Sequence, residues 1–254
     1  MFIDTHAHIY LKELAATRAQ LVQRAKDAGV ETIYMPAISS EEMEDLLAME
    51  AAYPDTCVAM MGLHPCYVKE NVEDELALVE TWLGKRSFAA IGEIGLDYYW
   101  DRNYDEQQLM AFTRQLAWAL ELQMPVVLHT RDAMDEAIAV VRPYAEKGLR
   151  GIFHCFGGTA LQAAQITDMG FYLGIGGVLT YKKSGLAEAI QGISTDWLVL
   201  ETDMPYLAPV PYRGKQNEVA YLPLVAQRLS EVYGKSLAEI ASITTANAIK
   251  IFGK

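Results

Sequence analysis

A chain of 254 residues is long enough to bury a large core and has the length typical of a single α/β barrel. Its formal net charge of −12 excludes a protein that coats nucleic acid through a broad basic face, although it permits local contacts to a phosphate. No apolar run approaches the length of a membrane span and the three cysteines are scattered, so we expect a cytoplasmic protein with reduced thiols.

Eight apolar runs of strand-like composition alternate with stretches of helical period. The runs cover residues 2–9, 31–37, 57–64, 88–95, 125–129, 151–155, 171–177 and 197–202. Helical stretches include 14–28, 41–52, 106–122, 160–169 and 222–233. The alternation predicts an α/β fold of repeated βα units, and we favour a closed (β/α)8 TIM barrel that forms one domain over residues 1–254. A doubly wound open sheet is the alternative, but no GxGxxG follows the first run.

The first run, FIDTHAHI, holds two of the five histidines of the chain. A strand alternates its side chains, so His6 and His8 are expected on the same side. One histidine at a strand end is more often hydrogen-bonded than bound to a metal. Two neighbouring imidazoles, however, would provide half of a metal site if the rest of the chain supplied further ligands.

Other runs also end in side chains that can bind a metal. Glu93, His129 and His154 lie at the ends of the fourth, fifth and sixth runs, and Glu201 and Asp203 lie at the end of the eighth. Because the carboxyl ends of barrel strands share one mouth, these groups are expected to converge there.

Four imidazoles and two carboxylates exceed the three protein ligands of a usual catalytic zinc, so we predict two divalent ions, with zinc, magnesium and manganese as candidates. A carboxylate can bridge two ions through its two oxygens, and Glu93 is the natural bridge. The predicted ligands are His6, His8, Asp203 and Glu93 for one ion, and His129, His154 and Glu93 for the other.

Two further residues are candidates for contact with a substrate. His64, in GLHP, is expected to orient a metal ligand or to touch the substrate, with a purely structural hydrogen bond as a less favoured alternative. Arg131 follows His129 by two residues and could hold a phosphate or a carboxylate. An ion pair between Arg131 and the adjacent Asp132 is an alternative of comparable weight.

Three loop segments carry residues suited to a nucleotide. The aromatic run DYYWD, residues 97–101, could stack on bases, or it could cover the barrel mouth, with packing favoured for at least two of its rings. Lys182 and Lys183, and the run Arg213–Lys215, could anchor phosphates, although loop cations are more often simply solvated.

The motifs THAHIY, GLHP, GEIGLDYYWD, VLHTRDA, HCFGG, ETDMPYLAP, RGKQNE and TTANAIKIFG together resemble the TatD family of metal-dependent deoxyribonucleases, a branch of the amidohydrolase superfamily. The resemblance runs from residue 2 to the end of the chain. It implies a TIM barrel with a two-metal site and 3′ to 5′ exonuclease activity on DNA. By position, the six predicted ligands match those of the family.

The resemblance leads us to expect a hydrolase of DNA ends or of another phosphoester, with no obligate protein partner. A hydroxide held between the two ions would attack phosphorus, and Asp203 would orient or deprotonate the water. Glu93 and Asp203 are therefore the expected catalytic carboxylates. The alternatives are a metal-dependent hydrolase of a small ester, lactone or amide and a non-catalytic nucleic-acid-binding protein.

Overall fold

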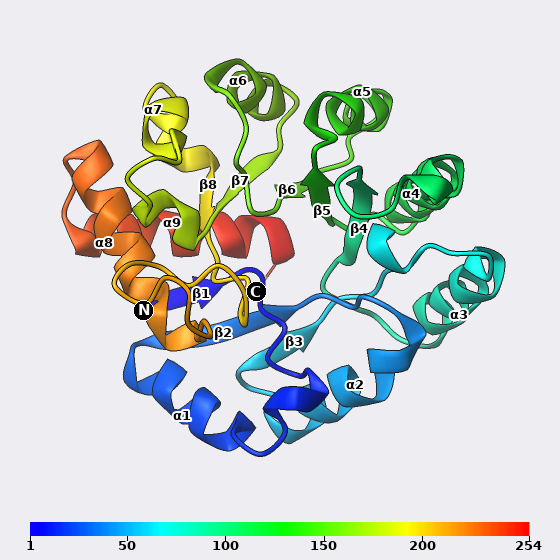
Figure 1. The fold of residues 1–254 in the computed structure, drawn as a ribbon, viewed down its shortest axis with the longest axis horizontal. Helices are drawn as coiled ribbons and strands as arrows, with labels where there is room; N and C mark the ends of the chain where they lie inside the picture. Colours follow the sequence, from blue (N-terminus) through cyan, green and yellow to red (C-terminus); the bar gives the residue numbers. More distant parts are fainter. Residues whose placement is uncertain (254) are drawn as a thin grey trace.

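In a computed structural model, which describes residues 1–253, parallel strands form a ring that is surrounded by helices (Figure 1). The last residue of the predicted domain 1–254 lies outside the described residues. The strands are β1 (Phe2–Asp4), β2 (Val30–Met35), β3 (Cys57–Ala59), β4 (Ile91–Asp97), β5 (Val126–Arg131), β6 (Gly151–Phe153), β7 (Tyr172–Ile175) and β8 (Leu198–Leu200). The helices are α1 (Arg18–Asp27), α2 (Met43–Ala52), α3 (Val72–Lys85), α4 (Asp105–Glu121), α5 (Met134–Ala145), α6 (Ala160–Asp168), α7 (Leu186–Ile190), α8 (Leu222–Tyr233) and α9 (Leu237–Phe252).

Two seams of backbone hydrogen bonds close the ring. Strands β1 to β3 form one parallel ladder and β4 to β8 another. Across the first seam, Met61 N donates to Ala90 O at 3.1 Å. Across the second, Thr5 N donates to Leu200 O at 3.0 Å, so the first strand lies beside the last. The closed (β/α)8 barrel is thereby confirmed, and the open doubly wound sheet is excluded.

The strands are shorter than the apolar runs that predicted them. The run over residues 2–9 contributes only Phe2–Asp4 to a ladder, after which the chain rises into the mouth of the barrel. There its backbone bonds to two different neighbours, with Ala7 N donating to Tyr34 O and His8 N donating to Met204 O. Residues beyond each short strand are therefore held in place without belonging to a regular sheet.

The interior of the barrel is filled by one side chain from each strand or its immediate neighbour. This cluster consists of Ile3, Tyr34, Met60, Ala90, Val127, Ile152, Tyr172 and Val199, with Ala248 of α9. Helix α9 passes behind the strands in Figure 1, and its Phe252 ring stacks on Tyr34 with centroids 3.8 Å apart. The amino-terminal end of the barrel is thus packed shut, which leaves the carboxyl ends of the strands as the open mouth.

Side-chain caps define where two of the helices begin. Thr159 and Gln162 form a capping box at α6, and Ser236 and Glu239 form another at α9. The predicted helix 222–233 coincides with α8, whereas the predicted helix 14–28 is shortened to α1 because residues 12–14 form a separate 3-10 turn. Among residues 1–253, no helix combines the length and the apolar character that crossing a bilayer requires.

A glycine in β6 tests how closely the barrel strands pack. A Cβ atom on Gly151 would lie 2.1 Å from the carbonyl oxygen of Val126, which belongs to the backbone of β5 and cannot move aside. We expect Gly151→Ala to lower the free energy of unfolding by about 1–3 kcal/mol, measured by chemical denaturation. Gly192→Ala is the matched control, since a Cβ there meets nothing within 4 Å. Equal stability of the two variants would contradict the close packing.

Candidate metal centre

The mouth of the barrel gathers the side chains that the sequence singled out. His6 and His8 follow β1, Glu93 lies in β4, His129 lies in β5, and His154 follows β6. Asp203 follows β8. The Nε2 atoms of His6 and His8 lie 3.2 Å apart, so both imidazoles face the same point, as the alternation of side chains along an extended segment requires.

Glu93 lies at the centre of this group, with only 2% of its side chain exposed. One carboxylate oxygen, Oε2, is 3.1 Å from His6 Nε2 and 3.5 Å from His8 Nε2. The other oxygen, Oε1, is 2.9 Å from His129 Nδ1 and 3.6 Å from His154 Nε2. The two oxygens therefore face two different sets of imidazoles.

Asp203 completes the first of these sets. Its Oδ1 lies 3.8 Å from His6 Nε2 and 3.6 Å from His8 Nε2. Donor atoms of His6, His8 and Asp203 all lie within 4.8 Å of one another, close enough to share one ion. The second set is looser, since His129 groups in this way with His64 and Cys66, and His154 groups with His6 and Glu93.

The electrostatics of the cluster favour the neutral form of three imidazoles and the ionised form of Glu93. Burial lowers the pKa of His64 and of His154, and it holds the pKa of His8 well below its usual value. Burial alone would raise the pKa of Glu93, but the imidazoles of His6, His64 and His154 outweigh it and hold that pKa well below its usual value. Neutral imidazole and ionised carboxylate are the forms that bind a metal ion.

His129 is held by a second carboxylate that the sequence analysis did not assign. Its Nε2 lies 2.8 Å from Oδ2 of Asp97, which is 1% exposed. Burial alone would lower the pKa of His129, but the hydrogen bonds to Asp97 and Glu93 raise it to about 9. A cation at Nδ1 would displace the proton there, while Asp97 keeps Nε2 protonated and the ring oriented.

His154 has a comparable neighbour in Glu201. Its Nδ1 lies 3.0 Å from Glu201 Oε1, and the same oxygen accepts a hydrogen bond of 2.5 Å from Cys155 N. A Cβ on Gly174 would lie 2.2 Å from the other oxygen of Glu201, so only glycine leaves room for this carboxylate. Glu201 is thus enclosed behind His154 and lies close to its Nδ1 without a hydrogen bond of ordinary geometry to it.

Asp4 ties the first ligand-bearing segment to the last. Its Oδ1 accepts hydrogen bonds from His6 N at 3.1 Å and from Thr202 N at 3.0 Å. Its Oδ2 accepts a third, of 2.5 Å, from the Thr202 hydroxyl. Asn217 supports the same segment from outside by donating to Thr202 O at 2.6 Å. The segment with His6 and His8 and the segment with Asp203 are therefore positioned by a single buried carboxylate.

The donor set fits divalent cations. Imidazole nitrogens and carboxylate oxygens converge within hydrogen-bonding distance in a largely buried space, which is the combination that zinc, manganese and related ions bind. Burial raises the pKa of Asp203 to about 6 and that of Glu201 to about 7, so a neighbouring cation would favour both ionised carboxylates. In residues 1–253, His6 Nδ1, His154 Nδ1 and Glu201 Oε2 are also buried without a hydrogen-bond partner.

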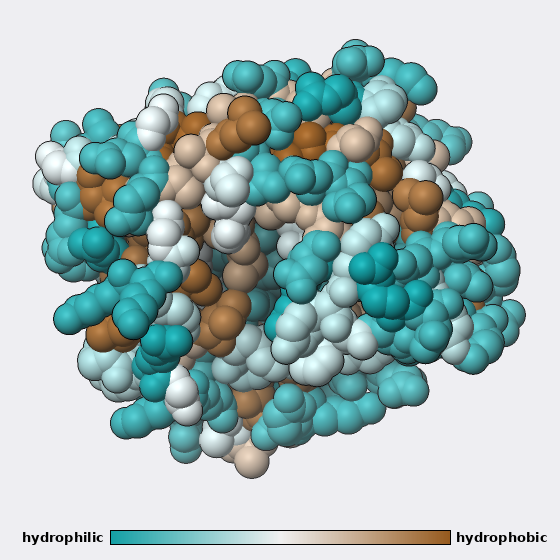
Figure 2. Space-filling view, turned by 45° about the horizontal axis from the view of Figure 1, so that its top comes forward, coloured by the Kyte–Doolittle hydropathy of each residue, from teal (hydrophilic) through white to brown (hydrophobic). Residues whose placement is uncertain are grey.

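A cavity of about 1040 Å³ opens above the cluster. Its floor includes His8, Glu93, His129, His154 and Asp203, whereas His6 is fully buried and does not line it. The molecular face in Figure 2 mixes hydrophilic and apolar residues and is hollowed near the centre of the view. A ligand in this cavity would meet both the metal-binding groups and the loops that form the rim.

The two predicted substrate contacts lie at different heights in the cavity, and both line it. His64 Nε2 is 3.3 Å from Glu93 Oε1, so this imidazole lies within the cluster itself. Arg131 is exposed at the rim, where its guanidinium lies 3.8 Å from the centroid of the Tyr99 ring and 5.2 Å from that of Trp100. The aromatic run 97–101 therefore divides, with Asp97 in the site and two exposed rings on the rim.

The sequence did carry a signal for Asp97. Glu93, Gly95 and Asp97 alternate along β4, and the register pairs Gly95 with His129 and Asp97 with Arg131. Residues two and four positions after a metal ligand on one strand share its face. The acidic residue at the start of DYYWD belonged to this strand, not to the loop that its aromatic neighbours suggested.

Comparison with known proteins gives a consistent classification. A family model described as TatD related DNase matches residues 3–253. The chain is 35% identical to the "Uncharacterized metal-dependent hydrolase YabD" of Bacillus subtilis, over 99% of both chains. It is 32% identical to a "3'-5' ssDNA/RNA exonuclease TatD" of Erwinia tasmaniensis, over 98% of both. The crystal structure of YJJV, a TatD homologue from Escherichia coli, superposes with a TM-score of 0.93 at 29% identity and covers 100% of this chain and 98% of its own.

The barrel with its buried imidazoles and carboxylates is thus that of a metal-dependent hydrolase. The chain belongs to the TatD-related DNase family, as the motifs predicted.

Asp97 provides a test of how the site holds His129. Asp97→Asn keeps the size and the acceptor oxygen of the side chain but removes the charge that faces His129 Nε2. We expect metal affinity to fall by about 10- to 100-fold with little change in Tm, measured by competition with a chromophoric chelator and by circular dichroism. Asp55→Asn, at an exposed turn before β3, is the control. Unchanged metal affinity in the Asp97 variant would remove Asp97 from the site.

Proposed function

We propose that this chain is a deoxyribonuclease that removes nucleotides from the 3′ end of single-stranded DNA. The observation that carries the proposal is the cavity, which combines a metal-binding floor with a rim of exposed aromatic rings and cations. Each nucleotide of a single strand has one charged phosphate and one base that can stack. The phosphates would contact the cations of the rim, and the bases would stack on its aromatic rings. The Erwinia tasmaniensis relative named as a 3'-5' ssDNA/RNA exonuclease supports the same activity.

We infer that two divalent ions occupy the cluster, with Glu93 between them. Its two oxygens face separate sets of imidazoles, which supports a bridging role. When bound, such ions supply Lewis-acid stabilisation of the phosphoryl charge and lower the pKa of a water molecule. The proposed ligands are His6, His8, Asp203 and Glu93 for one ion, and His129, His154 and Glu93 for the other.

Asp203 is the proposed proton acceptor. Its side chain is 13% exposed, compared with 2% for Glu93, so of the two carboxylates it is the more accessible to water in the cavity. Asp203 N donates to His6 O at 2.9 Å, which fixes the carboxylate relative to the first imidazole. A carboxylate held in this way can accept the proton of the water that attacks phosphorus.

The rim supplies proposed contacts to the rest of the nucleotide. Trp100 is 67% exposed and lines the cavity beside Arg131, where a terminal base can stack on the indole ring. Arg131 is kept in place by the Tyr99 ring, with its N–H groups available to a phosphate oxygen. His64, next to Glu93 on the floor, is the proposed side-chain contact to the substrate closest to the scissile bond.

Metal removal tests the activity itself. We expect protein dialysed against EDTA to leave a 5′-labelled single-stranded oligonucleotide intact, because the imidazoles and carboxylates alone cannot activate water at neutral pH. Adding back magnesium, manganese or zinc should restore a ladder of successively shorter products on a denaturing gel, and a circular single strand should resist cleavage.

The same protein and ions are then tested on phosphate-free esters, lactones and amides. If the protein hydrolysed these compounds but did not cleave the oligonucleotide, the proposed nuclease activity would be wrong and the protein would be a hydrolase of carbonyl substrates. Binding of the oligonucleotide without cleavage by any of the ions would indicate a non-catalytic nucleic-acid-binding protein.

Trp100 tests the stacking platform. Base stacking on an aromatic side chain contributes about 1–3 kcal/mol, so we expect Trp100→Ala to raise KM for an oligonucleotide by roughly 5- to 150-fold with a smaller effect on kcat. Trp100→Phe should retain most of the affinity because it keeps a π-face. Leu122→Ala, which trims a half-exposed side chain in the turn before β5, is the control. If KM for Trp100→Ala equalled that of the control, Trp100 would not stack on a base and would only cover the mouth of the barrel.

A further inference from the structure

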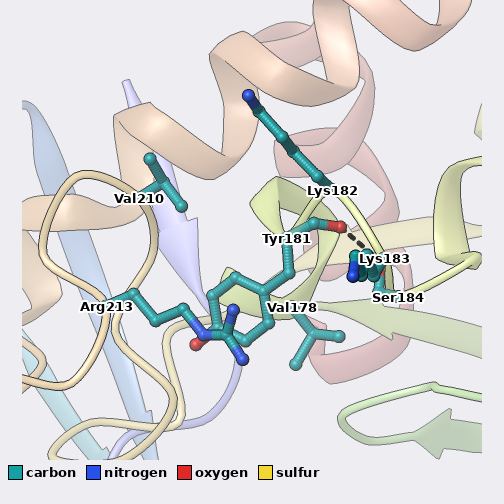
Figure 3. Close-up of a pocket in the computed structure, with 7 residues that line it drawn as sticks. All are labelled: Val178, Tyr181, Lys182, Lys183, Ser184, Val210 and Arg213. Carbon is teal, nitrogen blue, oxygen red and sulfur yellow. Dashed lines mark hydrogen bonds between the residues drawn. The ribbon is translucent and has the colours of Figure 1, made fainter.

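A second cavity, of about 590 Å³, adjoins the first at the barrel mouth. It lies between the segment that follows β7 and the loop that follows β8, and Figure 3 shows the residues that line it. Tyr181 and Arg213 line both cavities and so form the boundary between them. A ligand too long for the first cavity can therefore extend past these two side chains into the second.

The boundary is built from both loops. The Tyr181 hydroxyl donates to Ala208 O at 2.8 Å, and the Thr180 hydroxyl accepts from Val210 N at 2.9 Å. The Arg213 guanidinium lies across the Tyr181 ring, 4.4 Å from its centroid, as Figure 3 shows. This stacking holds the arginine at the junction and leaves the edge of the guanidinium free to donate hydrogen bonds.

The second cavity is basic in a protein that is acidic overall. Lys182, Lys183 and Arg213 line it, whereas the chain as a whole carries a formal net charge of −12. In the described part of the chain, no carboxylate forms an ion pair with these three cations. Lys182 and Lys183 are exposed, and Lys182 extends away from the Arg213 guanidinium in Figure 3. The cations of Lys182 and Arg213 are therefore held apart, so they can meet separate anionic groups.

We propose that the second cavity binds phosphates of the strand on the 5′ side of the nucleotide held in the first cavity. The inference rests on the proposed nuclease function and extends it with a subsite. Arg213 contacts the phosphate at the boundary, and Lys182 and Lys183 contact phosphates beyond it. Contacts to phosphates depend on charge and carry no information about the base sequence. The subsite therefore favours long strands over dinucleotides and does not select among bases.

The test compares substrates of two lengths in Lys182→Ala/Lys183→Ala. We expect KM for a single-stranded decamer to rise while its kcat stays within a factor of about two, and KM for a dinucleotide to stay unchanged because it ends before the lysines. Each phosphate contact to a single strand contributes about 0.7 to the slope of log affinity against log salt concentration. Loss of two contacts therefore lowers the slope by about 1.4, which corresponds to an affinity for the decamer that is roughly 25-fold lower at about 0.1 M salt.

Binding supplies a readout that does not depend on turnover. With metal-loaded protein and a fluorescent decamer whose last linkages are phosphorothioates, the salt slope of the double variant should be shallower by about 1.4 than that of the unmodified chain. Lys85→Ala/Lys147→Ala is the matched control, because it removes the same charge from exposed lysines that precede strands β4 and β6, at the opposite end of the barrel.

The outcomes separate the two proposals. If the unmodified protein cleaves both substrates and the two double variants behave alike, the subsite is wrong and the nuclease stands. If the unmodified protein cleaves neither substrate, the nuclease and its subsite fail together. A loss of affinity that is equal for the dinucleotide and the decamer would also overturn the subsite, since it would place the lysines at the first cavity.

Discussion

The candidate site depends on one buried carboxylate that faces imidazoles on both sides. Glu93 is 2% exposed, and its oxygens lie within 3.6 Å of nitrogens from five histidines. A carboxylate in such a place is stable as an anion only where positive charge or hydrogen-bond donors compensate it. The barrel provides this compensation, because the strand ends that carry the imidazoles meet around Glu93 only when the barrel is closed.

Closure and ligand placement rely on the same contacts. Asp4 bonds to the backbone of His6 and of Thr202, and in doing so it joins β1 to β8 at the level where the first and last ligands emerge. At the other end of the barrel, α9 packs under the strands through Phe252 and closes the interior. Stability is therefore concentrated at the bottom and the polar cluster at the top, which is the usual division of roles in this fold.

The fold and most of the cluster could be predicted because they depend on periodicity. Alternating runs indicated the barrel, and the polar residues at the ends of several runs marked its mouth. His129 and His154 were therefore found although they lie 25 positions apart in the sequence. What escaped prediction depends on strand register and loop conformation. Asp97 was assigned to a loop because its aromatic neighbours suggested one, and the contact of Arg131 with Tyr99 requires knowledge of how that loop turns back over β5.

The floor of the site is rich in carboxylates, whereas its rim carries cations. Glu93, Asp97, Glu201 and Asp203 lie close together, and in a protein of net charge −12 they would repel a phosphodiester brought to the same place. Two divalent cations would reverse that sign locally, so metal binding would be a condition for holding the substrate as well as for cleaving it. Arg131, Arg213 and the lysines of the second cavity lie farther out, where the negative charge of the floor would no longer dominate. Acidity elsewhere on the surface would then disfavour binding of the proposed strand outside this path.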